Sequence, residues 1–403
     1  MKSTFLVSTA VAAGVLLTGC VAADKPAEPT TEVKPKAQTV VKSEAVAKEV
    51  AAVKQEAKAE VKAVEKPKAK ATKRMTQEEV LAAVRGGSYA DYPRAQQFIE
   101  EMKAEGFDEA YLREVLGKAK RQTSILKAIS RPAEGTLNWG QYRQIFLKEK
   151  RINQGVQFWQ ENRQALMDAE KAYGVPAEII VSIIGVETRY GRITGSYRVL
   201  DALATLGFDY PRRSEFFLGQ LKEYLLLVRE EQVEITSLKG SYAGAMGYGQ
   251  FIPSSYRNFA IDFDEDGKRD IWKNKRDAIG SVANYFAEHK WKPGEPVISS
   301  LSFQKERDES WYSVGRKGLI PKHTLGEWQA RGVQPQLDLN PEGKAILMRL
   351  VMGEDEQYWL GLHNFYVITR YNHSKLYAMA VYRLSEQIKA AYEKAETGQV
   401  AKK

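Results

Sequence analysis

Residues 175–191, which read VPAEIIVSIIGVETRYG, restrict the possible folds of this chain more than any other stretch. Pro176 stands where a helix favours proline at its first position, and Gly191 follows where a helix favours glycine after its end. Between them, apolar residues cover almost every face of the predicted helix. We therefore expect neighbouring elements to surround this helix.

Glu187 lies in the last turn of the predicted helix, on the same side as Ile183 and Ile184. Burial and the negative end of the helix dipole both favour the protonated form of a carboxyl group there. A glutamate in that state can act as a general acid near neutral pH. The alternative is a solvated side chain that pairs with Arg189 or Arg192.

The N-terminus looks like a targeting segment rather than part of the fold. Residues 5–17 form an apolar run that is too short to cross a bilayer comfortably, and it leads into Leu-Thr-Gly-Cys20. This pattern resembles a bacterial lipoprotein signal. The resemblance implies removal of residues 1–19 and a diacylglyceryl thioether on Cys20, the only cysteine. The alternative is a plain secretory peptide with an incidental thiol.

Val21 follows the cysteine in place of aspartate. In such lipoproteins this residue implies sorting to the outer membrane. We therefore expect a protein anchored through lipidated Cys20 on the periplasmic face of the outer membrane of a Gram-negative cell. Its membrane partner is then the lipid layer itself, without a spanning helix.

Residues 20–74 are expected to form a disordered tether, because residues 21–74 contain no aromatic residue and consist mostly of Ala, Lys, Glu, Val and Pro. The tether carries a net charge of +5 out of +9 for the whole chain. Lys2 accounts for another +1, which leaves only +3 for residues 75–403. The basic character therefore belongs to the leader and tether, and we expect no nucleic-acid partner.

Residues 75–395 have the composition and pattern of a mainly α folded unit, and residues 396–403 are a tail. Alternation at 297–302 and many Gly and Pro residues predict a small β-containing insertion over residues 292–339. Helical patterns are expected at 93–102, 108–116, 139–146, 153–173, 198–207 (stopped by Gly207), 214–229, 277–289, 343–352 and 374–388.

Five motifs together resemble the membrane-bound lytic murein transglycosylase B family. They are GVETRYG at 185–191, YPRR at 210–213, AGAMGYGQFIPSSY at 243–256, DAIGSVANYF at 277–286 and NFYVITRYN at 364–372. They occur in the order typical of that family. The resemblance implies a lysozyme-like catalytic core over residues 151–291 and 340–395, with an additional helical region at 75–150.

The resemblance also implies an activity and a set of site residues. The expected substrate is the glycan strand of peptidoglycan, cut at the β-1,4 bond between N-acetylmuramic acid and N-acetylglucosamine. Glu187 is then the single catalytic acid and base. The residues expected to bind sugar are Tyr142, Arg212, Arg213, Ser241, Gln250, Phe251, Tyr285, Tyr371, Asn372 and Tyr377.

Each of these binding roles has a structural alternative. The glycine-dense stretch before Gln250 could be a tight packing turn, and the tyrosines could pack in the core. Arg212 and Arg213 could instead meet lactyl or peptide carboxylates. We expect one or two of the tyrosines to be core residues.

One carboxyl group can suffice for the reaction if the substrate supplies the nucleophile. Glycosidases ordinarily use two carboxylates, and the motif around Glu187 offers no obvious second one. Glu187 would protonate the leaving oxygen and then remove the proton from the 6-hydroxyl of the same sugar. The product is a 1,6-anhydromuramoyl end. The alternatives are a muramidase that uses water and a non-catalytic peptidoglycan-binding lipoprotein.

An acidic loop begins at Asp262 and matches the first half of a calcium-binding EF-hand loop. Asp262, Asp264 and Asp266 occupy positions 1, 3 and 5, Gly267 occupies position 6, and Lys268 offers a backbone carbonyl at position 7. At position 12 Lys273 replaces the usual glutamate. The family resemblance implies Asp277 as the closing ligand. We expect a structural Ca²⁺ here, and the alternative is a solvated acidic turn.

The chemistry needs no catalytic cofactor. The four histidines form no HExxH pattern or other close pair, so a catalytic zinc site is not expected.

Overall fold

A computed structural model describes residues 88–130 and 137–400. The chain divides into two units, residues 1–74 and 75–403, and all described residues belong to the second. The predictions for the signal peptide, Cys20 and the tether lie outside the described residues. Within the described part, no helix combines the length and apolar character that a membrane span requires.

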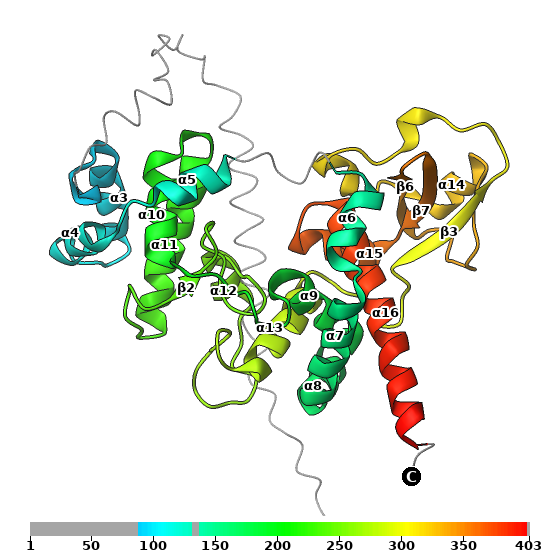
Figure 1. Cartoon of the computed structure of the whole chain (residues 1–403). Coiled ribbons are helices and arrows are strands. Elements are labelled where there is room, and N and C mark those ends of the chain that lie inside the picture. The colour runs from blue at the N-terminus through cyan, green and yellow to red at the C-terminus, as the bar shows by residue number, and fades with distance from the viewer. Residues whose placement is uncertain (1–87, 131–136, 401–403) are drawn as a thin grey trace, which may run out of the picture. The chain divides into compact units, whose positions relative to one another are not determined.

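One group of helices packs around α9 (Ala177–Thr188), as the sequence predicted (Figure 1). Its members are α6 (Trp139–Phe146), α7 (Glu149–Glu161), α8 (Arg163–Tyr173), α13 (Lys275–Glu288), α15 (His363–Tyr371) and α16 (Lys375–Val400). Helix α9 contacts α7, α8, α13 and α16 directly. Nine of its residues are buried, which explains why its sequence is apolar on nearly every face.

A second core is formed by helices from two separate parts of the sequence. They are α3 (Pro93–Ala104), α4 (Glu109–Lys118), α5 (Thr123–Ile129), α10 (Val199–Asp209), α11 (Ser214–Glu230) and α12 (Pro253–Phe259), with the short helices η1 (Tyr89–Asp91) and η3 (Pro211–Arg213). Strands β1 (Tyr197–Arg198) and β2 (Lys239–Gly240) pair beside this core. The predicted helices at 93–102, 108–116 and 214–229 are confirmed.

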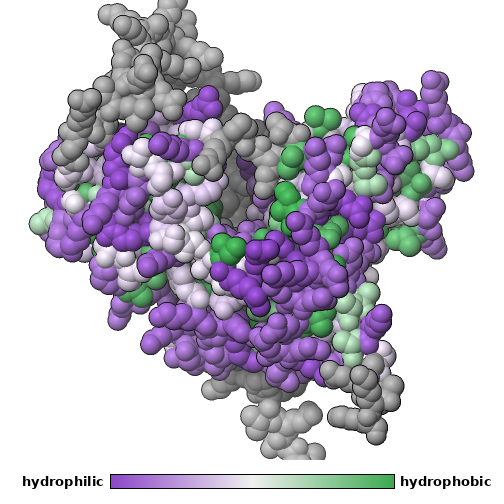
Figure 2. All heavy atoms as spheres, viewed as in Figure 1, coloured by the Kyte–Doolittle hydropathy of each residue, from purple (hydrophilic) through white to green (hydrophobic). Residues whose placement is uncertain are grey.

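The third core belongs to an antiparallel sheet with strand order β4-β6-β7-β3-β5. Its strands are β3 (Ile298–Phe303), β4 (His323–Thr324), β5 (Val333–Pro335), β6 (Lys344–Met352) and β7 (Asp355–Gly361), accompanied by α14 (Leu325–Ala330), η4 (Glu309–Trp311) and η5 (Arg316–Leu319). The predicted strand near 297–302 is confirmed as β3. Figure 2 shows that the visible face of the molecule is mostly hydrophilic, with apolar residues in small separate groups.

The prediction of a helix at 343–352 is wrong, because residues 344–352 form strand β6. This strand packs Ile346 and Met348 into the core around α9 and Ala345 and Leu347 into the core of the sheet. A strand buried on both faces shows no polar alternation, so its sequence can be mistaken for a helix. The β-containing region therefore extends to Gly361 rather than ending at residue 339.

Three other predicted boundaries differ from the structure. Asn162 separates α7 from α8, where a single helix was predicted over 153–173. Gly207 lies inside α10, and a Cβ there would come within 2.8 Å of Leu218 Cδ2, so this glycine allows close packing against α11. Helix α16 continues to Val400 beyond the tail boundary predicted at 396.

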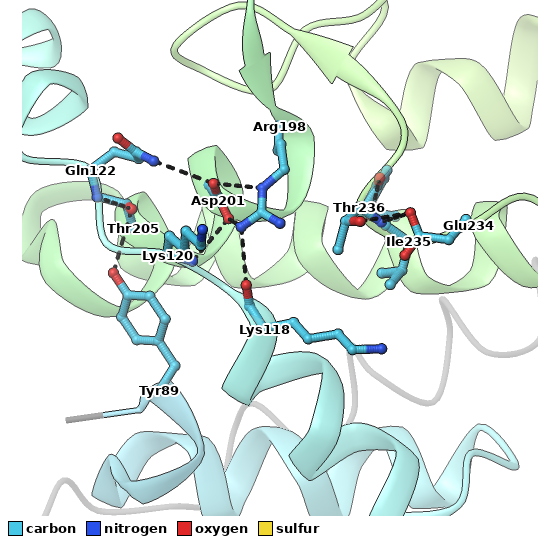
Figure 3. Close-up of polar contacts among 11 residues, drawn as sticks. Tyr89, Lys118, Lys120, Gln122, Arg198, Asp201, Thr205, Glu234, Ile235 and Thr236 are labelled. Carbon is cyan, nitrogen blue, oxygen red and sulfur yellow. Dashed lines mark hydrogen bonds and ion pairs between the residues drawn. The ribbon is translucent and has the colours of Figure 1, made fainter.

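A buried aspartate joins the N-terminal helices to α10 (Figure 3). Asp201 Oδ1 accepts a hydrogen bond from the Lys120 backbone amide at 2.9 Å, and Oδ2 accepts one from Arg198 Nε at 2.8 Å. One turn later, Thr205 Oγ1 accepts a hydrogen bond from the Gln122 amide at 3.1 Å. These bonds satisfy polar groups that the packing of α10 removes from water.

We expect Asp201→Ala to destabilise the folded unit by about 3 kcal/mol, because it leaves the Arg198 charge and a backbone amide without their acceptor. Thermal or urea unfolding followed by circular dichroism measures this loss. Glu234→Ala is the matched control, since Glu234 is an exposed carboxylate that bonds only to nearby Thr236. The control should leave the melting temperature almost unchanged, and equal losses in both variants would contradict the prediction.

Candidate active site

The end of α9 has an unusual backbone that fixes the helix turn carrying Glu187. Arg189, Tyr190 and Gly191 have φ values of 51°, 62° and 81°. Left-handed residues other than glycine are strained, and they persist only where the surrounding structure holds them. The Tyr190 amide donates to the Ile184 carbonyl at 3.2 Å, which satisfies one of the last carbonyls of the helix.

Buried Thr188 connects this helix end to the glycine-dense loop at 244–250. Its Oγ1 lies 3.0 Å from the Tyr248 carbonyl and accepts a hydrogen bond from the Gly191 amide at 2.9 Å. A Cβ at Gly191 would lie 2.0 Å from Tyr248 Cε1, so the ring of Tyr248 requires glycine at this position. The loop and the helix end are therefore held against each other.

Arg151 supports the same helix from the other side, and the sequence analysis did not identify it. Its Nη1 donates to the Gly185 carbonyl at 2.9 Å, and its own carbonyl accepts from the Tyr190 hydroxyl at 2.9 Å. Burial, with a smaller effect of Arg189, lowers the pKa of Arg151. The helical pattern of α7 gave no signal that one of its arginines would point inward.

Glu187 is half-buried and faces Tyr377 of α16. The Tyr377 hydroxyl donates to Glu187 Oε1 at 2.6 Å. Burial, followed by the charge of Glu187, raises the pKa of Tyr377 well above its usual value, so the phenol keeps its proton and remains a donor. This bond fixes the orientation of the carboxyl group between two helices that are far apart in the sequence.

We expect Tyr377→Phe to lower kcat by about 10- to 100-fold with little change in KM. A hydrogen bond to a charged group contributes about 1.5–3 kcal/mol, and this one orients the carboxyl group. Steady-state kinetics on peptidoglycan measures both constants. Tyr382→Phe is the control on the same helix, because the charge of Glu386, not that of Glu187, acts on its phenol. An unchanged kcat in Tyr377→Phe would contradict the positioning role.

Phe251, Tyr285 and Tyr371 form an aromatic cluster between the two helical cores. The ring of Tyr371 lies 4.7 Å from that of Tyr285 and 6.0 Å from that of Phe251, between ring centres. Phe251 is only 3% exposed, and the Tyr285 hydroxyl donates to the Arg370 carbonyl at 2.6 Å. Both side chains are therefore packed as core residues in this structure.

Tyr371 connects this cluster to the glycine-dense loop beside α9. Its hydroxyl donates to the Gly249 carbonyl at 2.6 Å, and its residue is only partly buried. Burial, followed by the charge of Glu187, raises the pKa of Tyr371 well above its usual value. The structure thus brings together the glycine-dense loop, Tyr371, Tyr377 and Glu187.

The side chains of Gln250 and Ser241 form hydrogen bonds with backbone groups in and beside the loop in this structure. Gln250 has a φ of 51°, and its Nε2 donates to the carbonyls of Thr194 and Gly247 at 3.1 Å each. Ser241 Oγ accepts from the Ala245 amide at 3.1 Å. Both residues are partly exposed, so each can shape the loop and still face a ligand.

The remaining predicted sugar-binding residues lie in three places. Tyr142 of α6 is buried and contributes to the raised pKa of Tyr377, which places the two phenols near each other. Asn372 is exposed directly after α15. Arg212 and Arg213 are exposed in η3, directly before α11, where the Arg213 guanidinium lies 4.2 Å above the ring of Phe216.

The acidic loop gathers the four aspartates that the sequence analysis selected. Asp262, Asp264, Asp266 and Asp277 each place a carboxylate oxygen within 4.8 Å of the others. Asp262 accepts from the Gly267 amide at 2.7 Å, and Gly267 has a φ of +89° that favours glycine. The backbone amide of Lys268 donates to Asp266 Oδ1 at 2.9 Å.

Asp277 is fully buried. Its two oxygens accept from the amides of Phe263 at 2.9 Å and Asp270 at 2.8 Å. Burial raises its pKa, the two amide bonds oppose this, and the charges of Asp264 and Asp262 add to it. Four carboxylates that repel one another fit a hard divalent cation with oxygen ligands, so the residues present suit Ca²⁺.

Comparison with known proteins finds a family model and a relative that each match most of the chain. Residues 90–386 match the family model described as the transglycosylase SLT domain. The chain is 46% identical over 316 residues to the membrane-bound lytic murein transglycosylase B of Escherichia coli strain K12, covering 76% of this chain and 85% of that protein.

Solved structures of similar proteins have the same fold. The lytic transglycosylase SltB1 of Pseudomonas aeruginosa aligns with a TM-score of 0.72 and 52% identity over 75% of this chain and 99% of that one. The Escherichia coli lytic transglycosylase Slt35 in complex with calcium aligns with a TM-score of 0.68 and 47% identity, over 76% of this chain and 96% of that one. SltB3 of Pseudomonas aeruginosa, in complex with NAG-NAM-pentapeptide, aligns with a TM-score of 0.66 and 32% identity, over 75% of this chain and 80% of that one. The lysozyme-like, mainly α fold is therefore confirmed.

Proposed function

The chain belongs to the family of lytic transglycosylases that carry the transglycosylase SLT domain, and from this premise we propose how it cleaves peptidoglycan. The substrate bond is the β-1,4 bond between N-acetylmuramic acid and N-acetylglucosamine. The contact that best supports a role for Glu187 is the 2.6 Å hydrogen bond from Tyr377. It orients a half-buried carboxyl group at the end of a buried helix.

Glu187 acts first as the general acid. Its proton passes to the oxygen that bridges the two sugars, and the bond between that oxygen and C1 of the muramoyl residue breaks. The carbonyl of the neighbouring N-acetyl group stabilises the oxocarbenium-like centre at C1. Tyr377 holds the carboxyl group in place during this step without contacting the reacting atoms.

Glu187 then acts as the general base. Its carboxylate takes the proton from the 6-hydroxyl of the same muramoyl residue, and the 6-oxygen forms a bond to C1. One C–O bond is broken and one is formed, and the proton returns to Glu187, so no water is consumed. The product ends in a 1,6-anhydromuramoyl residue.

Mass spectrometry of muropeptides released from purified sacculi tests this reaction. Anhydromuropeptides as the primary products support it, whereas reducing-end muropeptides would indicate a muramidase that uses water. Release of neither product, together with retained binding to sacculi, would indicate a non-catalytic peptidoglycan-binding lipoprotein.

The acidic loop is proposed to bind a structural Ca²⁺ through the carboxylates of Asp262, Asp264, Asp266 and Asp277 and the carbonyl of Lys268. A solved relative in complex with calcium supports this proposal, as does the convergence of the four carboxylates. The ion would neutralise their repulsion and hold the loop against α13. It takes no part in proton transfer.

The protein is further proposed to be anchored in the outer membrane through a lipid on Cys20, facing the periplasm. The sequence before Cys20 and the membrane-bound name of the relative support this proposal. We expect the mature protein to partition into the detergent phase of a phase-separating detergent. Cys20→Ala should move it to the aqueous phase, and an aqueous wild type would contradict the anchor.

A further inference from the structure

Three basic side chains meet at the turn between α15 and α16. Arg370 Nη1 lies 3.2 Å from His373 Nε2, and Arg316 Nη2 lies 3.1 Å from the same atom. An arginine N–H can only donate, so His373 Nε2 accepts both bonds and its proton is on Nδ1. Arg316 comes from η5 in the β-containing region, so two separate parts of the chain form this basic cluster.

The positive charge of the basic cluster has no acidic partner among the described residues. Burial lowers the pKa of His373, and the charges of Arg316 and Arg370 lower it further. Neither arginine forms an ion pair with a carboxylate in the described part of the chain. Nearby Arg349 differs, because Glu309 and Glu356 both pair with it. Two neighbouring cations without a counter-charge favour the binding of an anion.

The basic cluster adjoins the catalytic region. Arg370 directly precedes Tyr371, whose hydroxyl contacts the glycine-dense loop. His373 lies in the turn before α16, four residues before Tyr377, whose hydroxyl contacts Glu187. The basic cluster is therefore close in sequence to two tyrosines of the candidate site.

A cavity of about 580 Å³ lies between α15 and the β-containing region, and none of the three residues of the basic cluster lines it. Tyr366 lines it, and the Arg370 guanidinium lies 5.9 Å from the centre of the Tyr366 ring. Ile320, which follows η5, lines it from the other side. Its charged lining residues carry both signs, since Lys292 and Lys344 are cationic and Glu295, Asp338 and Glu342 are anionic. Such a lining suits a peptide that has both carboxylates and an amine.

We propose that Arg316 and Arg370 bind a carboxylate of the peptide stem attached to the muramoyl residue, and that the stem continues into this cavity. The inference rests on the proposed function and names the part of the substrate that the β-containing region recognises. Arginine suits this task because its planar guanidinium can donate two parallel hydrogen bonds to a carboxylate.

The test compares peptidoglycan that carries its stems with glycan strands from which an amidase has removed them. We expect Arg316→Gln to raise KM for the stem-bearing substrate by about tenfold, with kcat unchanged and KM for the stripped strands unaffected. Lys317→Gln is the matched control, because Lys317 is exposed beside Arg316 and loses the same charge. Arg316→Lys should recover only part of the affinity, since the ammonium lacks the fork geometry.

Each outcome decides the proposal. Equal effects of Arg316→Gln on both substrates, no effect on either, or the same effect in Lys317→Gln would overturn it. Soluble muropeptides with free or amidated stem carboxylates distinguish the carboxylate from the rest of the stem. Equal binding of the two forms would also overturn it. If wild type releases anhydro products from neither substrate, the proposed function fails instead.

Discussion

Glu187→Gln is expected to release anhydromuropeptides at least about a thousandfold more slowly than wild type. A positioned acid or base contributes about 10²- to 10⁴-fold to a rate, and one carboxyl group performs both tasks in the proposed mechanism. Glutamine keeps the size of the side chain and an oxygen that can accept from Tyr377. The variant therefore removes the transferable proton while leaving the packing of α9 intact.

The measurement is the initial rate of product release from sacculi, together with a melting curve. Glu178→Gln is the matched control, because Glu178 lies in the first turn of α9 and pairs with Lys389 at 2.9 Å. It should keep nearly full activity. A Glu187→Gln protein that is folded and retains more than about a tenth of the wild-type rate would exclude the single-carboxyl mechanism.

Removal of calcium is expected to lower the stability of the folded unit by about 4 kcal/mol when the ion is present at a thousand times its dissociation constant. Without the ion, the carboxylates around buried Asp277 repel one another. Differential scanning calorimetry with excess Ca²⁺ or a chelator measures the shift in melting temperature.

Asp264→Asn should abolish most of this calcium-dependent shift. Asp264 Oδ2 accepts from Asn274 Nδ2 at 2.8 Å, and an asparagine oxygen can keep that bond while removing one ligand charge. Glu265→Gln is the control, since Glu265 is exposed in the same loop, outside the carboxylate group. A full calcium shift in Asp264→Asn, or no shift in wild type, would remove the proposed ion.

Local sequence patterns predicted most of the helices well. The capping position of Asp108 and the proline at Pro93 mark the starts of α4 and α3. The apolar stretch around Ile183 predicted a buried helix because a single pattern covers all its faces. These features depend on residues within a few helical turns of each other, so they can be predicted from the local sequence.

The predictions of secondary structure were wrong where packing against elements distant in sequence determines the structure. Strand β6 is apolar because two cores lie on its two faces, and one of them includes residues that come before it by more than a hundred positions. Gly207 was taken as a helix stop, but the neighbouring helix requires its small size. A local sequence pattern does not show which distant element will pack against a strand or a helix.

For the candidate site, too, some features follow from the local sequence and others only from the tertiary structure. The sequence by itself determined the buried helix, the position of Glu187 at its end and the spacing of Asp262, Asp264 and Asp266, because each follows from a local pattern. The family resemblance, not local spacing, added Asp277. Only the tertiary structure decided that Tyr377 donates to Glu187, that Arg151 supports α9 and that Arg316 joins Arg370. These contacts join residues separated by tens to hundreds of positions, and chain folding, not local pattern, brings them within hydrogen-bond distance.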